Sequence, residues 1–362
     1  MIESEFIPEP YSGELPEGEV SWSSPSNIAL VKYWGKYDPQ LPANPSISLT
    51  LENSRTTTNL EYSKRKHAGT DFSINFLFEG NERPDFIPKI NTFFKRIENY
   101  LPFLTEYDFN IRSSNSFPHS SGIASSASAM SALALCLMSI EKGMHPEMSD
   151  DFFNRKASFL SRLGSGSACR SIEGPVVAWG QHEDVPESSD LFGLPFPFEL
   201  HHDFKSYHDA ILLVHEGQKE VSSTVGHDLM KNHPYASTRF EQANQNLSEL
   251  IPILQIGDLK GFTKIVEQEA LALHAMMMTS SPYFVLMKPN TLNIINKVWG
   301  FRAETGLNLC FTLDAGANVH LLFPDAESEE IYEFIKNELV AYCENGHYIC
   351  DQVGIGARLN PM

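Results

Sequence analysis

Residues 117–129 read FPHSSGIASSASA and bring glycine, small side chains and hydroxyl groups together directly before an apolar run. That run predicts a helix from Ser125 to Lys142, which Gly143 ends. The first N–H groups of a helix have no partner within it, and the helix dipole is positive there, so a phosphate group could bind at this position. The stretch contains neither the GxxxxGK[ST] pattern nor a lysine or arginine. Taken alone, it fits an ordinary helix start at least as well.

Three further stretches carry charged side chains in unusual surroundings. Lys32 lies inside the apolar run IALVKYW, where a lysine either extends to solvent or pairs with an anion. Arg170 lies near the end of GSGSACRS, and its planar guanidinium suits a carboxylate because it forms two parallel hydrogen bonds. Asp314 lies in TLDAGAN, where a turn-initiating aspartate is the everyday alternative. Each stretch alone has a structural explanation, but the occurrence of all four together is hard to explain by chance.

The composition sets the class of protein. The chain has 362 residues, of which 42% are hydrophobic, and its length suggests two domains. No run of about 18 apolar residues is present, so no membrane span is expected. The formal net charge of −19 argues against a nucleic-acid partner, although a small phosphorylated ligand needs only a local basic cluster. Five cysteines without zinc-site spacing predict buried free thiols in the cytoplasm.

The elements that must position these residues follow from periodicity and turn signals. Strands are predicted at 45–62, 72–79, 107–113, 175–179 and 209–215, and as a pair at 308–313 and 318–323 around the Asp314 turn. Further helices are predicted at 86–101, 149–163, 234–250, 257–273, 289–304 and 327–343, with Ser149 or Asp150 as the N-cap of the second. The irregular interleaving favours an α+β fold. We expect a flexible arm at 1–19, one lobe at 20–195 and a second at 196–362.

The sequence resembles the diphosphomevalonate decarboxylases of the GHMP kinase superfamily. The resemblance runs from Asn27 to about Gly356 and rests on NIALVKYWGKYD, PSISLTL, NSFPHSSGIASSASA, GSGSACRS, EVSST and TLDAGAN. It implies a two-lobed fold, with an N-terminal lobe like ribosomal protein S5 domain 2 and a ferredoxin-like C-terminal lobe. It also implies ATP- and Mg²⁺-dependent decarboxylation of mevalonate 5-diphosphate to isopentenyl diphosphate, CO₂, ADP and phosphate.

The resemblance assigns roles to individual residues. Asp314 would act as the general base or orient the 3-hydroxyl, Lys32 would bridge that carboxylate and the transferred phosphoryl, and Arg170 would hold the substrate carboxylate. The expected substrate-binding residues are Asn27, Tyr33, Lys36, Ser165, Ser167 and Arg170. The expected ATP-binding residues are Ser120, Ser121, Gly122, Ala124, Ser125, Ser126 and Ser128. Ser126 is also the expected neighbourhood of Mg²⁺, since no pair of carboxylates indicates a metal site.

Some positions depart from the family pattern and leave alternatives open. Ala317 stands where proline is common, Glu173 where glycine is common, and HSS where small apolar residues are usual. A relative acting on mevalonate or mevalonate 5-phosphate, as a 3-kinase or a phosphomevalonate decarboxylase, therefore remains an alternative. A nucleic-acid-binding or regulatory module fits poorly with the net charge of −19. The expected partners are the small-molecule substrate and ATP, and the resemblance is compatible with a homodimer.

Overall fold

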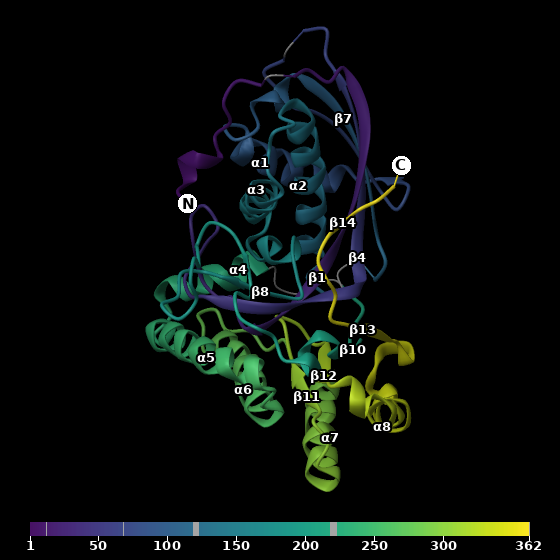
Figure 1. Cartoon of the computed structure of the whole chain (residues 1–362). Coiled ribbons are helices and arrows are strands. Elements are labelled where there is room, and N and C mark those ends of the chain that lie inside the picture. The colour runs from purple at the N-terminus through teal and green to yellow at the C-terminus, as the bar shows by residue number, and fades with distance from the viewer. Residues whose placement is uncertain (12, 68, 119–122, 218–222, 362) are drawn as a thin grey trace.

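Two long antiparallel strands, β1 (Glu17–Val31) and β4 (Ser46–Lys64), carry the first sheet, as Figure 1 shows. The computed structural model describes residues 1–11, 13–67, 69–118, 123–217 and 223–361. The strand order of this sheet is β14-β1-β4-β7-β5-β6. In addition, β8 pairs with the first residues of β4, and β9 pairs with β8. Its other strands are β5 (Ser73–Phe78), β6 (Asn81–Glu82), β7 (Tyr107–Asn115), β8 (Val176–Trp179), β9 (Leu194–Pro195) and β14 (Arg358–Leu359).

The second sheet is smaller and lies in the C-terminal half of the chain. Its antiparallel order is β11-β12-β10-β13. These strands are β10 (His208–Leu212), β11 (Cys310–Thr312), β12 (Val319–Phe323) and β13 (Tyr348–Gln352), and a separate hairpin joins β2 (Lys36–Tyr37) to β3 (Leu41–Pro42). The predicted strand pair around the Asp314 turn is confirmed, because Cys310 pairs with Leu322.

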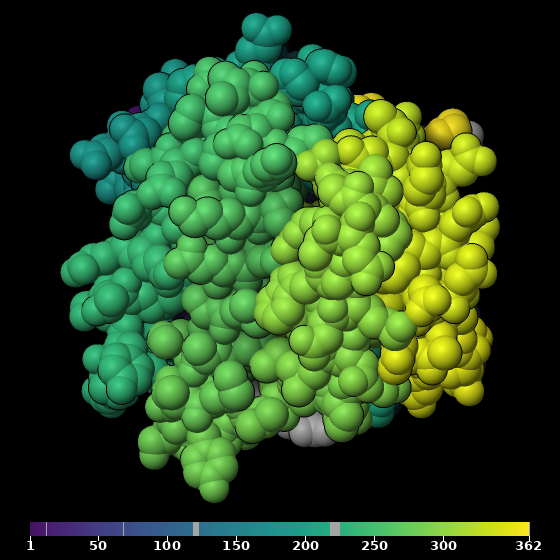
Figure 2. Space-filling model, turned by 90° about the horizontal axis from the view of Figure 1, so that it is seen from below, coloured from purple at the N-terminus to yellow at the C-terminus, as the bar shows by residue number. Residues whose placement is uncertain are grey.

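The helices divide between the two sheets. They are α1 (Ile87–Ile97), α2 (Ser125–Met144), α3 (Asp150–Gly164), α4 (Ser223–Asp228), α5 (Ala236–Ile256), α6 (Leu259–Met278), α7 (Pro289–Thr305) and α8 (Ser328–Phe334). Helices α1 to α3 pack against the first sheet, whereas α5 to α8 gather at the opposite end of the molecule (Figure 1). Seen from that end, the surface consists largely of these C-terminal helices (Figure 2). In the described part of the chain, no helix combines the length and apolar character needed to cross a membrane.

The helix predictions hold with local corrections. The Oγ of Ser149 accepts the Phe152 N–H at 3.2 Å, so Ser149 is the N-cap of α3. The predicted helix at 327–343 is α8 followed by a π-helical segment (Ile335–Leu339) and a 3₁₀ segment (Val340–Tyr342). The segment is therefore helical throughout but changes its hydrogen-bond spacing, which side-chain periodicity alone does not reveal.

The expected flexible arm at 1–19 contains an anchored segment. A 3₁₀ turn (Glu3–Phe6) carries Phe6, which is fully buried and stacks on Phe159 of α3 at 4.4 Å between ring centroids. Strand β1 already begins at Glu17, within the range assigned to the arm. The acidic composition of residues 1–19 predicted flexibility and gave no sign that Phe6 would be buried.

The two halves of the chain share a core and are joined by hydrogen bonds. Ile28 and Leu49 of the first sheet pack in one cluster with Phe262 of α6. The buried carboxylate of Asp351, on β13, accepts backbone N–H groups of Asn53 at 2.8 Å and Ser54 at 2.7 Å on β4. The final strand, β14, returns to pair with β1 at Trp22 and Ser23. A lobe boundary near residues 195 and 196 therefore remains a proposal about folding units, since the C-terminus belongs to the first sheet.

Candidate active site

Lys32 and Asp314 form an ion pair between the two sheets. Lys32 directly follows β1, Asp314 lies in the turn between β11 and β12, and Lys32 Nζ lies 3.1 Å from Asp314 Oδ1. The Lys32 side chain is 2% exposed, whereas that of Asp314 is 29% exposed. Burial lowers the pKa of Lys32, and the Asp314 carboxylate opposes this shift. The Asp314 carboxylate is therefore accessible to a ligand, whereas the Lys32 ammonium paired with it is buried.

The backbone at Lys32 is held by a second carboxylate, which the sequence analysis did not identify. Glu269 of α6 is fully buried and accepts the Lys32 N–H at 2.8 Å. The same carboxylate accepts hydrogen bonds from Arg239 Nη2 and Asn246 Nδ2 of α5, each at 2.5 Å. Glu269 therefore fixes the end of β1 to two helices of the second half of the chain.

The backbone at Asp314 is also anchored by α6. His274 lies 3.1 Å through Nε2 from the carbonyl oxygen of Asp314, so this nitrogen must donate. Burial lowers the pKa of His274 to about 4, which keeps the imidazole neutral near pH 7. One helix, α6, thus positions both members of the Lys32–Asp314 pair.

Arg170 lies in a pocket of neutral hydrogen-bond acceptors. It belongs to the 3₁₀ segment η4 (Gly166–Ser171) and is 2% exposed. Its guanidinium donates to Ser48 Oγ at 3.1 Å, Ser46 Oγ at 2.5 Å and Asn27 Oδ1 at 3.4 Å. Burial lowers the pKa of Arg170, and Asp314 is among the groups that oppose this, so the three predicted catalytic residues lie in one electrostatic environment. The two serines come from the PSISLTL segment and were not among the predicted site residues.

Asn27 links Arg170 to the loop that contains Ser165 and Ser167. Its Nδ2 donates to the Ser167 carbonyl oxygen at 3.2 Å and to Ser171 Oγ at 2.8 Å. The β1–β4 register shifts between Pro25 and Asn27, and such a bulge redirects side chains. Asn27 thus serves to position Arg170 and the backbone of the loop.

The start of α2 lies beside the same loop. Ser126 Oγ is 3.2 Å from Ser165 Oγ, and Ala124 adopts a left-handed conformation at φ 40° before the helix begins at Ser125. The prediction that Ser128 binds ATP is wrong, because its hydroxyl is fully buried and pairs with Thr56 Oγ1 at 2.6 Å. Because of this pairing, it is unsuited to contact a phosphate. The remaining predicted residues Ser120, Ser121 and Gly122 lie outside the described residues.

Tyr33 and Lys36 follow Lys32 in the KYWGK segment. The Tyr33 ring packs against Trp179 at 4.7 Å and His227 at 4.2 Å, and its hydroxyl is buried without a hydrogen-bond partner in the described part of the chain. Lys36 Nζ donates to Gln40 Oε1 at 2.9 Å, and burial lowers the pKa of Lys36. The Tyr33 hydroxyl therefore lies beside η4, 2.7 Å from where a Cβ added at Gly166 would be, and a binding role for Lys36 stays a prediction.

His227 is a further residue that the sequence analysis missed. Its Nδ1 accepts the N–H of Gly35 at 3.0 Å, and its ring also packs on Trp34 at 4.9 Å. Burial lowers the pKa of His227 to about 3, so the ring is neutral. It supports the KYWGK segment from α4, nearly 200 residues away in sequence, and no local pattern signals such a contact.

An apolar cavity of about 80 Å³ opens beside the first turn of α2. We call it the α1–α2 cavity. Its lining residues are Thr58, Phe76, Phe78, Phe86, Lys89, Ile90, Ile111, Ser113, Asn115, Ser125, Ser126, Ala129, Met130 and Leu133. Phe86 stacks on Phe76 and Phe78 at 5.6 and 5.8 Å between centroids. A flat aromatic group would fit such a lining, and the cavity shares Ser125 and Ser126 with the candidate phosphate site.

The fold indicates the superfamily of the protein, and the family models then indicate its family. The α+β fold of two sheets matches solved mevalonate diphosphate decarboxylase structures and is that of the GHMP kinase superfamily. Residues 24–190 match the family model of the diphosphomevalonate decarboxylase-like N-terminal domain, and residues 210–354 match that of the mevalonate 5-diphosphate decarboxylase C-terminal domain. The chain therefore belongs to the diphosphomevalonate decarboxylase family.

Individual relatives agree with this assignment. The diphosphomevalonate decarboxylase of Ganoderma lucidum is 31% identical over 333 residues, which cover 86% of this chain and 80% of that protein. The human diphosphomevalonate decarboxylase is 27% identical over 344 residues, which cover 90% of this chain and 80% of that protein.

Solved structures show the same relation. The mevalonate diphosphate decarboxylase of Staphylococcus aureus is 27% identical, with a TM-score of 0.81 over 95% of this chain and 98% of that one. A protein denoted MDDEF, solved in complex with MVAPP, AMPPCP and magnesium, is 26% identical, with a TM-score of 0.80 over 96% of this chain and 100% of that one. The expected fold is thus confirmed over nearly the whole chain.

Proposed function

We propose that the protein catalyses the ATP-dependent decarboxylation of mevalonate 5-diphosphate to isopentenyl diphosphate, CO₂, ADP and phosphate. The observation that carries this proposal is the Lys32–Asp314 pair at 3.1 Å beside the buried Arg170, in a chain of this family. A β-hydroxy acid loses CO₂ readily once its hydroxyl becomes a leaving group. The two functions that a site must then supply are activation of the 3-hydroxyl and control of the carboxylate.

Asp314 activates or orients the 3-hydroxyl of the substrate. Its carboxylate is partly exposed and can accept the hydroxyl proton as the oxygen attacks the γ-phosphorus of ATP. Because phosphoryl transfer passes through a loose transition state, orientation is the larger part of this role. Lys32 keeps Asp314 ionised and stabilises negative charge on the transferred group.

Arg170 holds the substrate carboxylate. Its hydrogen-bond partners Ser46, Ser48 and Asn27 are neutral, so they orient the guanidinium without neutralising it. A carboxylate bound there loses CO₂ as the C–C bond breaks, and the bonding electrons form the new C=C bond while phosphate departs with the 3-oxygen. Ser165 and Ser167 line the adjoining loop and bind the same end of the substrate.

The start of α2 receives the ATP phosphates. Its free N–H groups and the hydroxyls of Ser125, Ser126 and Ser165 form a donor-rich corner, and the α1–α2 cavity beside it accepts the adenine ring. Hydroxyl oxygens together with nucleotide phosphates suit Mg²⁺, which prefers oxygen ligands, so Ser126 is the residue we place nearest the ion. When bound, Mg²⁺ supplies neutralisation of phosphate charge.

Tyr33 and Lys36 bind the diphosphate of the substrate. The unsatisfied hydroxyl of Tyr33 supports this placement, because a buried donor without a partner is costly unless a ligand accepts its hydrogen bond. Lys36 adds a positive charge on the same side. We place the reaction in the cytoplasm, supported by five free cysteines. A homodimer stays a prediction.

A substrate panel tests the proposal. Mevalonate, its 5-phosphate and its 5-diphosphate are each incubated with ATP and Mg²⁺, and both ADP and CO₂ are measured. Equal amounts of ADP and CO₂ from the 5-diphosphate alone are expected. ADP without CO₂ would instead identify a 3-kinase, and turnover of the 5-phosphate would identify a phosphomevalonate decarboxylase.

A further inference from the structure

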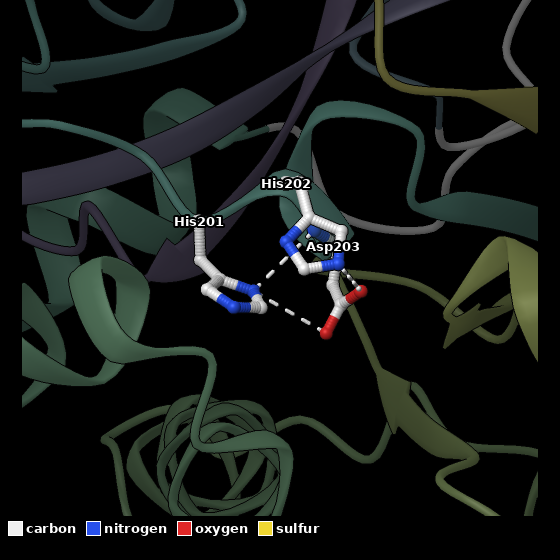
Figure 3. A group of neighbouring side chains, drawn as sticks. All are labelled: His201, His202 and Asp203. Carbon is white, nitrogen blue, oxygen red and sulfur yellow. Dashed lines mark hydrogen bonds and ion pairs between the residues drawn. The ribbon is translucent and has the colours of Figure 1, made fainter.

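Two histidines and an aspartate, consecutive in the sequence, converge on the surface. His201, His202 and Asp203 lie between β9 and β10, at the start of the 3₁₀ segment η5 (His202–Lys205), and Figure 3 shows their side chains turned toward one another. One ligand atom from each residue lies within 4.8 Å of the others. His201 Nδ1 is 3.3 Å from Asp203 Oδ2, and His202 Nε2 is 3.2 Å from Asp203 Oδ1.

One of these distances matches the spacing of two ligand atoms around a tetrahedral metal ion. Zn²⁺ binds imidazole nitrogen and carboxylate oxygen at about 2.0–2.1 Å, and the edge of such a tetrahedron is therefore about 3.3–3.4 Å. The separation of His201 Nδ1 from Asp203 Oδ2, 3.3 Å, has nearly this length, whereas His202 Nε2 lies 3.2 Å from the other oxygen of the same carboxylate, Oδ1. To share an ion with His201 Nδ1 and Asp203 Oδ2, the His202 ring must turn away from Oδ1, and its side chain is 81% exposed.

The electrostatics of the cluster also favour a cation. His201 Nδ1 lies 3.4 Å from the Asp203 N–H, a donor, and 3.3 Å from the Asp203 Oδ2, an acceptor. One ring nitrogen carries either a proton or a lone pair, so it satisfies only one of these neighbours. A cation between Nδ1 and Oδ2 satisfies both acceptors and sacrifices only the long hydrogen bond to the backbone.

The cluster is held in place by its own surroundings. The His201 N–H donates to the Leu254 carbonyl oxygen of α5 at 2.9 Å, and the His201 ring packs directly on Gly257, where an added Cβ would lie 2.5 Å from it. Phe204, the next residue after Asp203, is fully buried in the core. A site with ordered ligands binds an ion more tightly, because less side-chain freedom is lost on binding.

We propose that His201, His202 and Asp203 form a binding site for Zn²⁺ or a similar transition-metal ion, with water completing the coordination. Two imidazoles and one carboxylate are ligands of this class, whereas Mg²⁺ prefers oxygen ligands in octahedral geometry. The site is thus chemically distinct from the magnesium neighbourhood at the start of α2. It is open on one side, as the exposure of His202 requires.

Calorimetric titration of Zn²⁺ into the full-length protein without a histidine tag tests the proposal. The variants are His202→Ala and Asp203→Asn, and the matched control is His67→Ala, which removes an exposed histidine elsewhere. We expect one site of highest affinity, weakened at least about tenfold in the first two variants and unchanged in the control. Co²⁺ in place of Zn²⁺ should give the intense visible bands of a four-coordinate ion, and these bands should disappear in His202→Ala.

Equal Zn²⁺ affinities of the wild type and the variant would overturn the proposal. If the wild type and His202→Ala bind Zn²⁺ with the same affinity, the ion is held elsewhere, for example at the exposed Cys350. Displacement of Zn²⁺ by a modest excess of Mg²⁺ would overturn it too. Decarboxylase turnover should be the same for wild type and His202→Ala, so the outcome does not depend on the proposed function.

Discussion

Replacement of Glu269 by glutamine removes a charge on which two helices and the site depend. Glu269 is fully buried and accepts hydrogen bonds from the Lys32 backbone, from Arg239 and from Asn246. Glutamine keeps the shape but offers one acceptor oxygen, and its amide group then faces a donor. The Nε and Nη1 atoms of Arg239 make no hydrogen bond within the described residues, so Arg239 relies on Glu269 for its counter-charge.

The expected size of the effect follows from these contacts. Loss of one member of a buried ion pair costs about 3–5 kcal/mol, because the remaining charge stays buried and unpaired. A retained neutral hydrogen bond recovers part of this, of order 1 kcal/mol. We therefore expect Glu269→Gln to lower the free energy of unfolding by about 2–4 kcal/mol. The kcat should fall as well, since the end of β1 carries Lys32.

Urea unfolding measured by circular dichroism, together with ADP and CO₂ release, provides the assay. Glu267→Gln is the matched control, since Glu267 lies on the same helix and binds Arg302 at 2.6 Å and Trp299 at 2.9 Å without contacting Lys32. Both variants should lose stability, but only Glu269→Gln should lose kcat at temperatures where both remain folded. An equal loss of kcat in the two would refute the positioning role. A stability loss below about 0.5 kcal/mol for Glu269→Gln would refute the buried-pair reasoning.

Four further outcomes follow from the site. Asp314→Asn should abolish turnover while ATP affinity stays within about threefold, and retention of most of the kcat would remove Asp314 from the mechanism. Arg170→Ala should raise the KM for the substrate far more than that for ATP, whereas equal losses would assign the arginine to the nucleotide or the fold. Because burial lowers the pKa of Lys32, the active ammonium is lost below the pH at which an ordinary lysine deprotonates, so kcat should fall on an alkaline limb below pH 10.5, and Lys32→Arg should move that limb upward. His227, with a pKa of about 3, should show no imidazole titration by NMR between pH 5 and 8.

Local patterns predicted the elements that carry their own signal. The strand pair around Asp314 and the N-cap at Ser149 follow from short-range turn and capping chemistry, and both are present. The strand nature of β1 was not predicted, because its second half is buried on both faces and shows no alternation. The same burial explains why Lys32 looked out of place among apolar neighbours.

The supporting residues of the site could not be read from the sequence. Glu269 and His274 lie on an ordinary amphipathic helix more than 200 residues from Lys32, and nothing in their neighbourhood distinguishes them from surface groups. For Ser128 the sequence predicted a ligand contact that the structure does not support. A hydroxyl in a serine-rich helix start can bond to a strand as easily as to a ligand. Tertiary contacts decided each case.

The return of β14 to β1 and the contact of Asp351 with β4 have a consequence for how the molecule comes apart. Neither sheet can melt without breaking hydrogen bonds that belong to the other, so a calorimetric scan should contain a single peak. A chain cut before residue 357 would also lose the edge partner of β1. A strand from residues 358–359 therefore completes the sheet that begins at residue 17.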